Sequence, residues 1–349
     1  MLKKNALKIT LIFVGVILLT IAIVTLAVSA GRKNDAENEN IISTISKNND
    51  ANERAYAKPY TILVLGRDSA AGLSDALMLV RLESINKRAT VLQIPRDTYA
   101  EYTENPYKKI NGAVSALGGA EKLCSFLSES LGIEINGYVS VDMDSLPYIV
   151  DSVGGVEIEL DEPLVYKDPE QELSINLPAG KQKLDGETAL HFLRYRSGYV
   201  RGDIGRMDAQ KIFLAALGSK IKSLGTIELA RVASVILPRI ETNVTLAQAL
   251  SLAKIASAIP EENIALVTLP GDEAVAIESG ASYYSLSAPA TSELLSKYFG
   301  LTDETFDKNG VFRNEKYESF KEIYENYKPY KLYTASSISE NGIIIDKHD

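Results

Sequence analysis

The sequence predicts an α/β fold in which a central mixed β-sheet is sandwiched between helices, with a transmembrane helix at the N-terminus. Three observations predict it. Short runs rich in β-formers end at Gly, Asp, Asn or Pro, segments with helical apolar spacing alternate with them, and one long uncharged run lies near residue 1. With 46% hydrophobic residues among 349, the chain has ample material for a core.

Residues 1–30 form a cytoplasmic stub and a transmembrane anchor in this interpretation. Lys3, Lys4 and Lys8 precede the uncharged run 9–30, which as a helix would extend roughly 33 Å, enough to cross the hydrocarbon core. The lysines predict a cytoplasmic N-terminus, so the globular part would be extracellular at the cell membrane, in a single-pass arrangement. The alternative is a cleaved signal peptide, because "AVSA" at 27–30 offers small residues for cleavage; the length of the run favours the anchor.

Residues 31–57 are rich in Asn, Asp, Glu and Ser, which predicts a flexible extracellular linker. The predicted globular domain, which would carry any catalytic site, follows at 58–300. Its predicted strands are 60–66, 76–83, 89–95, 138–141, 156–160 and 264–269, and 164–183 is predicted as a hairpin or excursion. Its predicted helices are 113–131, 144–153, 185–195, 203–224, 227–237 and 246–259.

The C-terminal extension, 301–349, carries aromatic residues at helical spacing: Tyr317, Phe320, Tyr324 and Tyr327. This predicts an amphipathic helix. Aromatic residues at this spacing could stack on sugar rings. More commonly they dock the helix onto the domain, which is the interpretation we favour.

Composition excludes several classes of function. A net charge of −9 argues against broad nucleic-acid binding, so any phosphate site must be local. The single cysteine, Cys124, can form no intrachain disulfide and is expected to be a buried apolar residue. With only His191 and His348 besides it, a zinc site is not expected, and His191 is interpreted as a packed helix residue.

The segment 184–214 concentrates arginines near acidic and amide side chains. Guanidinium groups grip phosphate oxygens with two parallel hydrogen bonds, although a solvated basic helix face is the commoner meaning of such a run. Asp203 is at a position where it could be a helix N-cap, a ligand of the site, or both. Asp203, Arg206 and Gln210 would share one helix face. The other residues of the cluster are Arg194, Arg196, Arg201 and Asp208.

Three further clusters lie at predicted strand or helix ends. Asp68 and Asp75 flank the turn between the first two strands, where carboxylates suit Mg²⁺ shared with phosphate oxygens; aspartates are also ordinary turn residues. Arg96 and Asp97 follow the third strand, at the kind of loop that carries ligand groups in α/β sheets. Lys109 precedes a predicted helix start near Asn111, where an anion could bind.

Seven motifs in fixed order resemble the LytR-CpsA-Psr family of cell-wall enzymes: "LVLGRDS", "SDALMLV", "IPRDTY", "KINGAVSALGG", "VDSVGGVEIEL", "LDGETALHFLRYR" and "GDIGRMDAQ". The resemblance covers about 60–299. It implies a membrane-anchored, Mg²⁺-dependent phosphotransferase outside the cell. Such an enzyme would move an anionic glycopolymer from a polyprenyl-pyrophosphate carrier to peptidoglycan through a phosphodiester link.

The resemblance also implies roles for individual residues. Asp68 and Asp75 would support magnesium, Lys109 would contribute to anion binding, and Asp97 or Asp203 would orient or deprotonate the acceptor hydroxyl. The residues that would hold the pyrophosphate are Arg96, Arg194, Arg196, Arg206 and Gln210. We expect Arg96 and Arg206 to be exposed, so that replacing them leaves the fold intact.

Two positions depart from the family pattern. Ala70 and Ala209 stand where the family usually has arginine, so each is expected to lose one donor, with Arg67 and Arg201 as nearby substitutes. This keeps open a second interpretation, a polyprenyl-phosphate-binding protein without catalysis or a cell-envelope regulator. A transcriptional attenuator is disfavoured by the predicted topology and by the net charge of −9.

Overall fold

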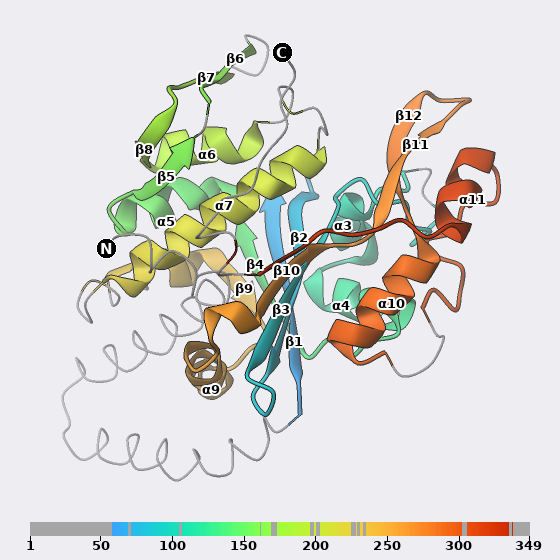
Figure 1. Cartoon of the computed structure of the whole chain (residues 1–349), viewed down its shortest axis with the longest axis horizontal. Helices are drawn as coiled ribbons and strands as arrows, with labels where there is room; N and C mark the ends of the chain where they lie inside the picture. Colours follow the sequence, from blue (N-terminus) through green and yellow to red (C-terminus); the bar gives the residue numbers. More distant parts are fainter. Residues whose placement is uncertain are drawn as a thin grey trace.

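A seven-stranded mixed β-sheet forms the centre of the computed structural model (Figure 1). The structure describes residues 58–68, 71–104, 107–160, 162–168, 173–195, 199, 203–224, 228, 231–232, 235–301, 306–334 and 337. The strands lie in the order β13-β10-β3-β2-β1-β4-β9. Their bounds are β1 Tyr60–Asp68, β2 Leu73–Glu83, β3 Arg88–Ile94, β4 Gly137–Asp142, β9 Ile240–Thr242, β10 Ile264–Thr268 and β13 Leu332–Thr334.

The sheet confirms the predicted α/β class with a mixed sheet. β1, β2 and β3 pair antiparallel as neighbours along the chain, whereas β1 pairs parallel with β4 and β3 pairs parallel with β10. The central strands are buried on both faces, which explains why their sequences are continuous apolar runs and not alternating ones.

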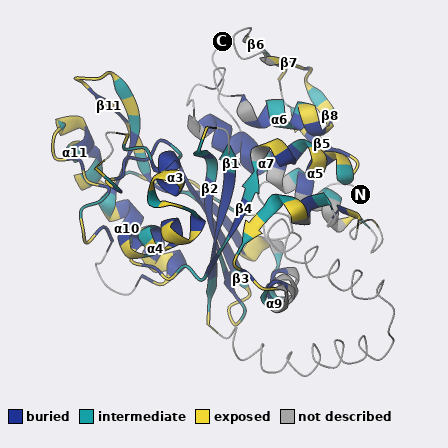
Figure 2. Ribbon diagram, turned by 180° about the vertical axis from the view of Figure 1, so that it is seen from behind, coloured by how far each residue is buried: buried dark blue, intermediate teal, exposed yellow. Residues whose placement is uncertain are grey.

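Helices cover both faces of the sheet. On one face, Leu63, Leu65 and Leu79 pack with α3, α4 and α10; on the other, Ile62 and Val64 pack with α9. Figure 1 shows these helices on opposite sides of the strands, and Figure 2 shows the strands between them as buried. The helix bounds are α3 Ala113–Leu117, α4 Ala120–Leu131, α9 Leu246–Ser257 and α10 Ala288–Phe299.

A third hydrophobic cluster lies beside the sheet, built from helices and two small two-stranded sheets. The hairpin predicted within 164–183 is confirmed as β6 and β7. The strand predicted at 156–160 forms, but it pairs with β8 and not with the central sheet. The bounds are α5 Leu146–Ser152, α6 Gly186–Arg194, α7 Asp203–Lys222, β5 Val156–Leu160, β6 Leu164–Asp168, β7 Leu173–Leu177 and β8 Gly180–Leu184.

Two helix predictions changed in detail. The helix predicted over 113–131 is interrupted by Gly118 and Gly119, whose φ angles of 87° and 125° end α3 before α4 begins. The helix predicted over 144–153 begins with a 3-10 turn, η2 (Met143–Ser145), and continues as α5. Only part of the predicted helix 227–237 is described.

The C-terminal part completes the fold. A hairpin of β11 (Gly271–Ala276) and β12 (Ala281–Leu286), which the sequence analysis did not predict, stands away from the sheet (Figure 1). The predicted tail helix is the short α11, Glu318–Glu325, whose Phe320 is fully buried against the hairpin, so the docking interpretation is confirmed. β13 then pairs antiparallel with β10 at the edge of the central sheet.

The predicted anchor and linker, residues 1–57, lie outside the described residues. Within the described ranges, the search for a helix of sufficient length and apolarity to span a membrane finds none.

Candidate functional site

The loop that follows β3 holds Arg96 and Asp97 in a fixed backbone conformation. The Thr98 N–H donates to the Pro95 carbonyl at 3.0 Å, and the Asn111 N–H donates to the Arg96 carbonyl at 3.1 Å. The Tyr284 N–H, from β12, donates to the Asp97 carbonyl at 2.9 Å. The backbone of the two residues is therefore held by the loop's own turn, by Asn111 and by β12.

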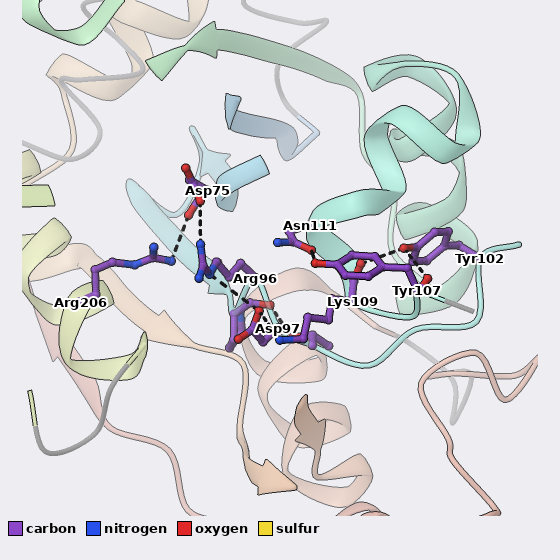
Figure 3. Close-up of polar contacts among 10 residues, drawn as sticks. Asp75, Arg96, Asp97, Tyr102, Tyr107, Lys109, Asn111 and Arg206 are labelled. Atoms are coloured by element: carbon purple, nitrogen blue, oxygen red, sulfur yellow. Dashed lines mark hydrogen bonds and ion pairs between the residues drawn. The ribbon is translucent and has the colours of Figure 1, made fainter. Parts of the chain in front are cut away.

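Asp75 occupies an irregularity in β2 that faces this loop. The β1–β2 register shifts after Gly66, which pairs with Ala76, while Arg67 pairs with Ser74; Asp75 is the extra residue between. Such a bulge turns a side chain away from its regular direction. Asp75 Oδ1 lies 2.9 Å from a terminal guanidinium nitrogen of Arg96, and Arg206 donates to the Asp75 carbonyl at 3.5 Å (Figure 3).

A small cavity lies where β2, β3 and α7 meet. Arg206 and Gln210 both face it, which confirms that they share one face of α7. Its polar groups are two guanidiniums, one carboxylate and two amides, and its remaining lining residues are apolar. Two guanidiniums beside one opening suit the oxygens of an anionic group such as phosphate. The lining residues are Asp75, Ala76, Leu77, Met78, Gln93, Ile94, Arg96, Arg206, Met207 and Gln210.

The expectation that Arg206 is exposed is wrong. Arg206 is only 5% exposed, because α7 packs its first turns against β2 and β3, and the Arg96 side chain is 22% exposed. Replacing Arg206 by alanine would thus leave a cavity as well as remove a charge.

A second polar group continues from this cavity along the same loop. Lys109 Nζ lies 3.2 Å from Asp97 Oδ1, and Lys109 immediately precedes η1, Ile110–Gly112, as predicted. Figure 3 shows the residues in a row, with the Tyr107 hydroxyl donating to Asn111 Oδ1 at 3.0 Å. The structure therefore brings Asp75, Arg96, Asp97, Lys109, Arg206 and Gln210 into one continuous region.

Other predicted residues are placed less completely. Arg194 ends α6 and Asp203 begins α7, but their side chains are not among those described. Arg196 and Arg201 lie outside the described residues. Their roles stay predictions.

The sequence analysis missed Gln93 and Met207. Gln93 Nε2 donates to the Met207 carbonyl at 3.4 Å, and its buried Oε1 has no hydrogen-bond partner among the described residues. Gln93 is a buried polar residue near the end of β3, between the apolar Leu92 and Ile94 and directly before the "IPRD" turn. A polar side chain in that position was the signal that could have found it.

Asp68 and Asp75 lie at the same end of paired strands, as expected for the proposed metal ligands. Asp68 Oδ1 accepts the Ala71 N–H at 2.9 Å, so it also has the ordinary turn role. Among the described residues, no group of three or more His, Cys, Asp or Glu side chains is placed to hold a metal ion. Two carboxylates fit the mode in which Mg²⁺ keeps waters and takes its remaining ligands from substrate phosphates.

The two departures from the family pattern differ in their surroundings. Ala209 is fully buried in the cluster with Phe192 and Phe213, so in this chain that position belongs to the core and not to the cavity. Ala70 lies outside the described residues. Arg67, the suggested substitute, pairs with Glu241 of β9 at 3.2 Å.

Comparison with known proteins identifies this arrangement of elements and motifs. A model of the LytR_cpsA_psr family matches residues 23–299. The chain belongs to the LytR_cpsA_psr family. The match ends before α11 and β13, so these two elements lie beyond the part that the family model covers.

The chain is similar to two transferases from Bacillus. It is 32% identical over 226 residues to the polyisoprenyl-teichoic acid--peptidoglycan teichoic acid transferase TagV of Bacillus subtilis (strain 168), covering 62% of this chain. The matched region spans 58% of that relative, less than two thirds of its length. It is also 31% identical, over 270 residues, to the polyisoprenyl-teichoic acid--peptidoglycan teichoic acid transferase TagU of Bacillus anthracis (strain CDC 684 / NRRL 3495). That match covers 76% of this chain and 83% of that relative.

The fold is that of solved family members. The crystal structure of B. subtilis TagV superposes with a TM-score of 0.58 at 29% identity, covering 70% of this chain and 99% of that one. The central mixed sheet with flanking helices is thus the LytR_cpsA_psr arrangement.

Proposed function

We propose that this protein is an extracellular, membrane-anchored phosphotransferase that moves an anionic glycopolymer from a polyprenyl-pyrophosphate carrier to peptidoglycan. The observation that carries the proposal is the convergence of Arg96 and Arg206, from distant parts of the chain, on one small cavity. Family membership and the names of the similar transferases support the same reaction.

In the proposed reaction, the acceptor hydroxyl oxygen attacks the phosphorus that carries the glycan. A new phosphodiester bond forms, the bond to the bridging oxygen breaks, and polyprenyl phosphate leaves with the electron pair. Arg96 and Arg206 hold the pyrophosphate and offset the charge that develops on the bridging oxygen, which stabilises the transition state more than the ground state. Arg194, Arg196 and Gln210 are proposed as further ligands of the same group.

Asp97 is proposed to orient the acceptor hydroxyl and take its proton, with Asp203 as the alternative base. The structure supports Asp97 because its backbone is held on both sides and its carboxylate is only 3.2 Å from Lys109 Nζ. Arg96 Nε lies 3.8 Å from the same carboxylate oxygen, so Asp97 adjoins a guanidinium of the proposed pyrophosphate site.

Magnesium is proposed to bind between Asp68, Asp75 and the pyrophosphate oxygens, where it would neutralise phosphate charge. Asp75 would then serve both the ion and Arg96, with which it is paired. Titration calorimetry of a lipid-linked donor, with magnesium and with chelator, tests this directly. Chelation of magnesium should weaken donor binding by the wild type but not by Asp75→Asn. The control variant Asp272→Asn, at an exposed position, should respond to chelation as the wild type does. Equal affinity of the wild type in both buffers contradicts the metal proposal.

The transfer proposal is tested with purified protein, lipid-linked glycopolymer, peptidoglycan and magnesium. Arg206→Lys keeps the charge but not the paired donors, and should lower kcat/KM about a hundredfold or more. Arg313→Lys, on the exposed tail surface, is the control and should be unchanged. Because Arg206 is buried, thermal unfolding must show that the variant is folded. Tight donor binding by the wild type without turnover would instead establish the lipid-binding alternative.

The membrane topology is tested separately. A phosphatase reporter that is active only outside the cytoplasm, fused after Asp349, should be active in cells. Activity only from a cytoplasmic reporter contradicts the proposed location. The mass of the purified chain shows whether cleavage near Ala30 has removed the predicted anchor.

A further inference from the structure

A group of aromatic rings lies beside Asp97 and Lys109, on the side away from Arg206, and the proposed reaction assigns it no role. Its members come from the loop after β3, from β12 and from the tail helix α11. Two rings form an inner layer: Phe320 is fully buried and Tyr99 is 6% exposed, with their centroids 5.6 Å apart. The inner layer packs the tail onto the domain.

The outer layer of rings is only partly buried. Tyr283 lies 5.7 Å from both Tyr99 and Phe320, and Tyr317 lies 5.7 Å from Phe320. Tyr283 and Tyr317 are partly exposed, and Tyr107 is 39% exposed. Tyr283 and Tyr317 are thus two partly exposed phenols on the inner layer. Tyr107 lies two residues before Lys109, which forms a β-bridge with Tyr99, so the segment that carries Tyr107 runs beside the same layer.

The outer layer borders the reacting groups directly. Lys109 Nζ lies 5.6 Å from the centroid of the Tyr283 ring while it contacts Asp97. The backbone of Tyr284, the next residue, exchanges hydrogen bonds with both Asp97 and Tyr99 at 2.9 Å. A ligand lying on Tyr283 would therefore be next to Lys109, which contacts the Asp97 carboxylate.

Tyr107 is fixed in the same region by close packing. A Cβ atom at Gly112 would lie 2.9 Å from the Tyr107 ring, so the ring rests on a position that only glycine leaves open. Its hydroxyl is bound to Asn111, and the Tyr102 hydroxyl lies 2.8 Å from the Tyr107 carbonyl. The ring is thus held in place without a ligand, which lowers the entropy cost of binding one.

We propose that Tyr107, Tyr283 and Tyr317, with Lys109, form a saccharide-binding subsite next to Asp97. This inference rests on the proposed function. The C–H face of a sugar ring packs on an aromatic face, while its hydroxyls bond to phenol and ammonium groups. Both the acceptor glycan and the glycopolymer of the donor have this chemistry, and the experiment below separates them.

The surroundings favour a saccharide over an apolar chain. The rim is charged: Lys316 lies over the Tyr317 ring at 5.2 Å and pairs with Glu278 of the hairpin. Covering these charges and the Lys109–Asp97 pair with hydrocarbon would remove their hydration without replacing it. The hydroxyl groups of a sugar would form hydrogen bonds with these charges in place of water.

Tyr317 and Phe320 lie beyond residue 299, where the family match ends. One wall of the subsite is therefore built from a segment outside the family-matched region.

The test measures binding of two probes by titration calorimetry: a soluble peptidoglycan glycan fragment without donor, and a lipid-linked glycopolymer without acceptor. Tyr283→Ala and Tyr317→Ala should each weaken saccharide binding about tenfold. Tyr327→Ala, an exposed tyrosine of the same tail, is the matched control and should leave both affinities unchanged. Tyr283→Phe keeps the ring and guards against loss of folding; it should retain most of the affinity, and all variants are compared by thermal unfolding.

Weakened binding of the fragment alone assigns the subsite to the acceptor, and weakened binding of the donor alone assigns it to the glycopolymer. Unchanged affinity for both probes in folded Tyr283→Ala and Tyr317→Ala overturns the subsite. A wild-type protein that binds the fragment but never transfers glycopolymer overturns the proposed function and leaves the subsite standing. If the wild type transfers glycopolymer and Tyr283→Ala and Tyr317→Ala transfer it equally well, the subsite is overturned and the proposed function stands.

Discussion

Cys124 shows how burial sets the chemistry of one residue. It lies on α4 with 8% of its surface exposed, and its Sγ is 3.9 Å from the Gly137 carbonyl. Burial raises the pKa of the thiol to about 12, so the reactive thiolate is scarce at ordinary pH. The expected role as a small apolar residue is confirmed.

We predict that Cys124 is almost unreactive in the native protein. At pH 8, a disulfide reagent such as Ellman's should modify it about a hundredfold more slowly than in denaturant, because both access and thiolate fraction are low. The Cys124→Ala variant supplies the background rate. Modification of the native protein at the denatured rate would contradict the burial.

The site residues show what a sequence can predict at this scale. Helical period placed Arg206 and Gln210 on one face of α7, and the cavity contains both. The burial of Arg206 and the bulge at Asp75 depend on how β2 packs against β1 and α7, which are distant in sequence. Local spacing contains no information about that packing, so neither could be predicted.

At the scale of elements, α6 offers a well-defined N-cap. Asp185 Oδ1 accepts the Thr188 N–H at 2.9 Å and its hydroxyl at 2.6 Å. Without this acceptor, a backbone donor in the first turn loses its partner. The cap fixes where α6 begins, and α6 packs against α5 and α7 in the third cluster.

We predict that Asp185→Ala lowers the free energy of unfolding by about 1 kcal/mol. Hydrogen bonds from the Thr188 hydroxyl and N–H lower the pKa of Asp185 below 3.8. A lowered folded-state pKa gives stability that is present at neutral pH and is lost as pH falls through that pKa. Urea unfolding should therefore show the difference from wild type at pH 7 and a smaller one near pH 3; a pH-independent difference contradicts the charge contribution.

Elements were predicted best where periodicity and end signals agree. The strands β1 to β3 and the helix α6 follow clear apolar patterns with recognisable ends. The β11–β12 hairpin was missed because its residues are small or polar on one side and gain their burial from α11, which lies far along the chain. The Gly118–Gly119 break was missed because helical apolar spacing continues across it.

At the scale of the whole molecule, the tail is part of the domain. Phe320 is fully buried between the hairpin and Tyr99, and Lys211 of α7 lies 5.6 Å from the Tyr333 ring of β13. Lys211 and Asp208 form a buried pair at 2.6 Å beneath that ring. The tail therefore covers groups that would otherwise face water.

We predict that Phe320→Ala lowers the free energy of unfolding by about 3–5 kcal/mol, as for large core aromatic residues. Tyr327→Ala, at a residue just beyond the end of α11 that is 52% exposed, should change it by less than about 0.5 kcal/mol. Urea midpoints of the two variants give the comparison. Similar, small effects would mean that the tail is only loosely docked.

Strand order could not be read from the sequence. The class followed from alternating strands and helices, but β10 lies beside β3 and β13 beside β10, and these neighbours are distant in sequence. Pairing of that kind is decided by shape and burial across the assembled sheet.

The position of β13 has a consequence for how the chain matures. During synthesis, β1, β2 and β3 are adjacent and can pair early, but the outer side of β10 stays open until residues 332–334 have been made. An unpaired strand edge is a template for association with other chains. The nascent protein therefore passes through a stage with an exposed sheet edge, and β13, the last of the described strands, is the one that closes it.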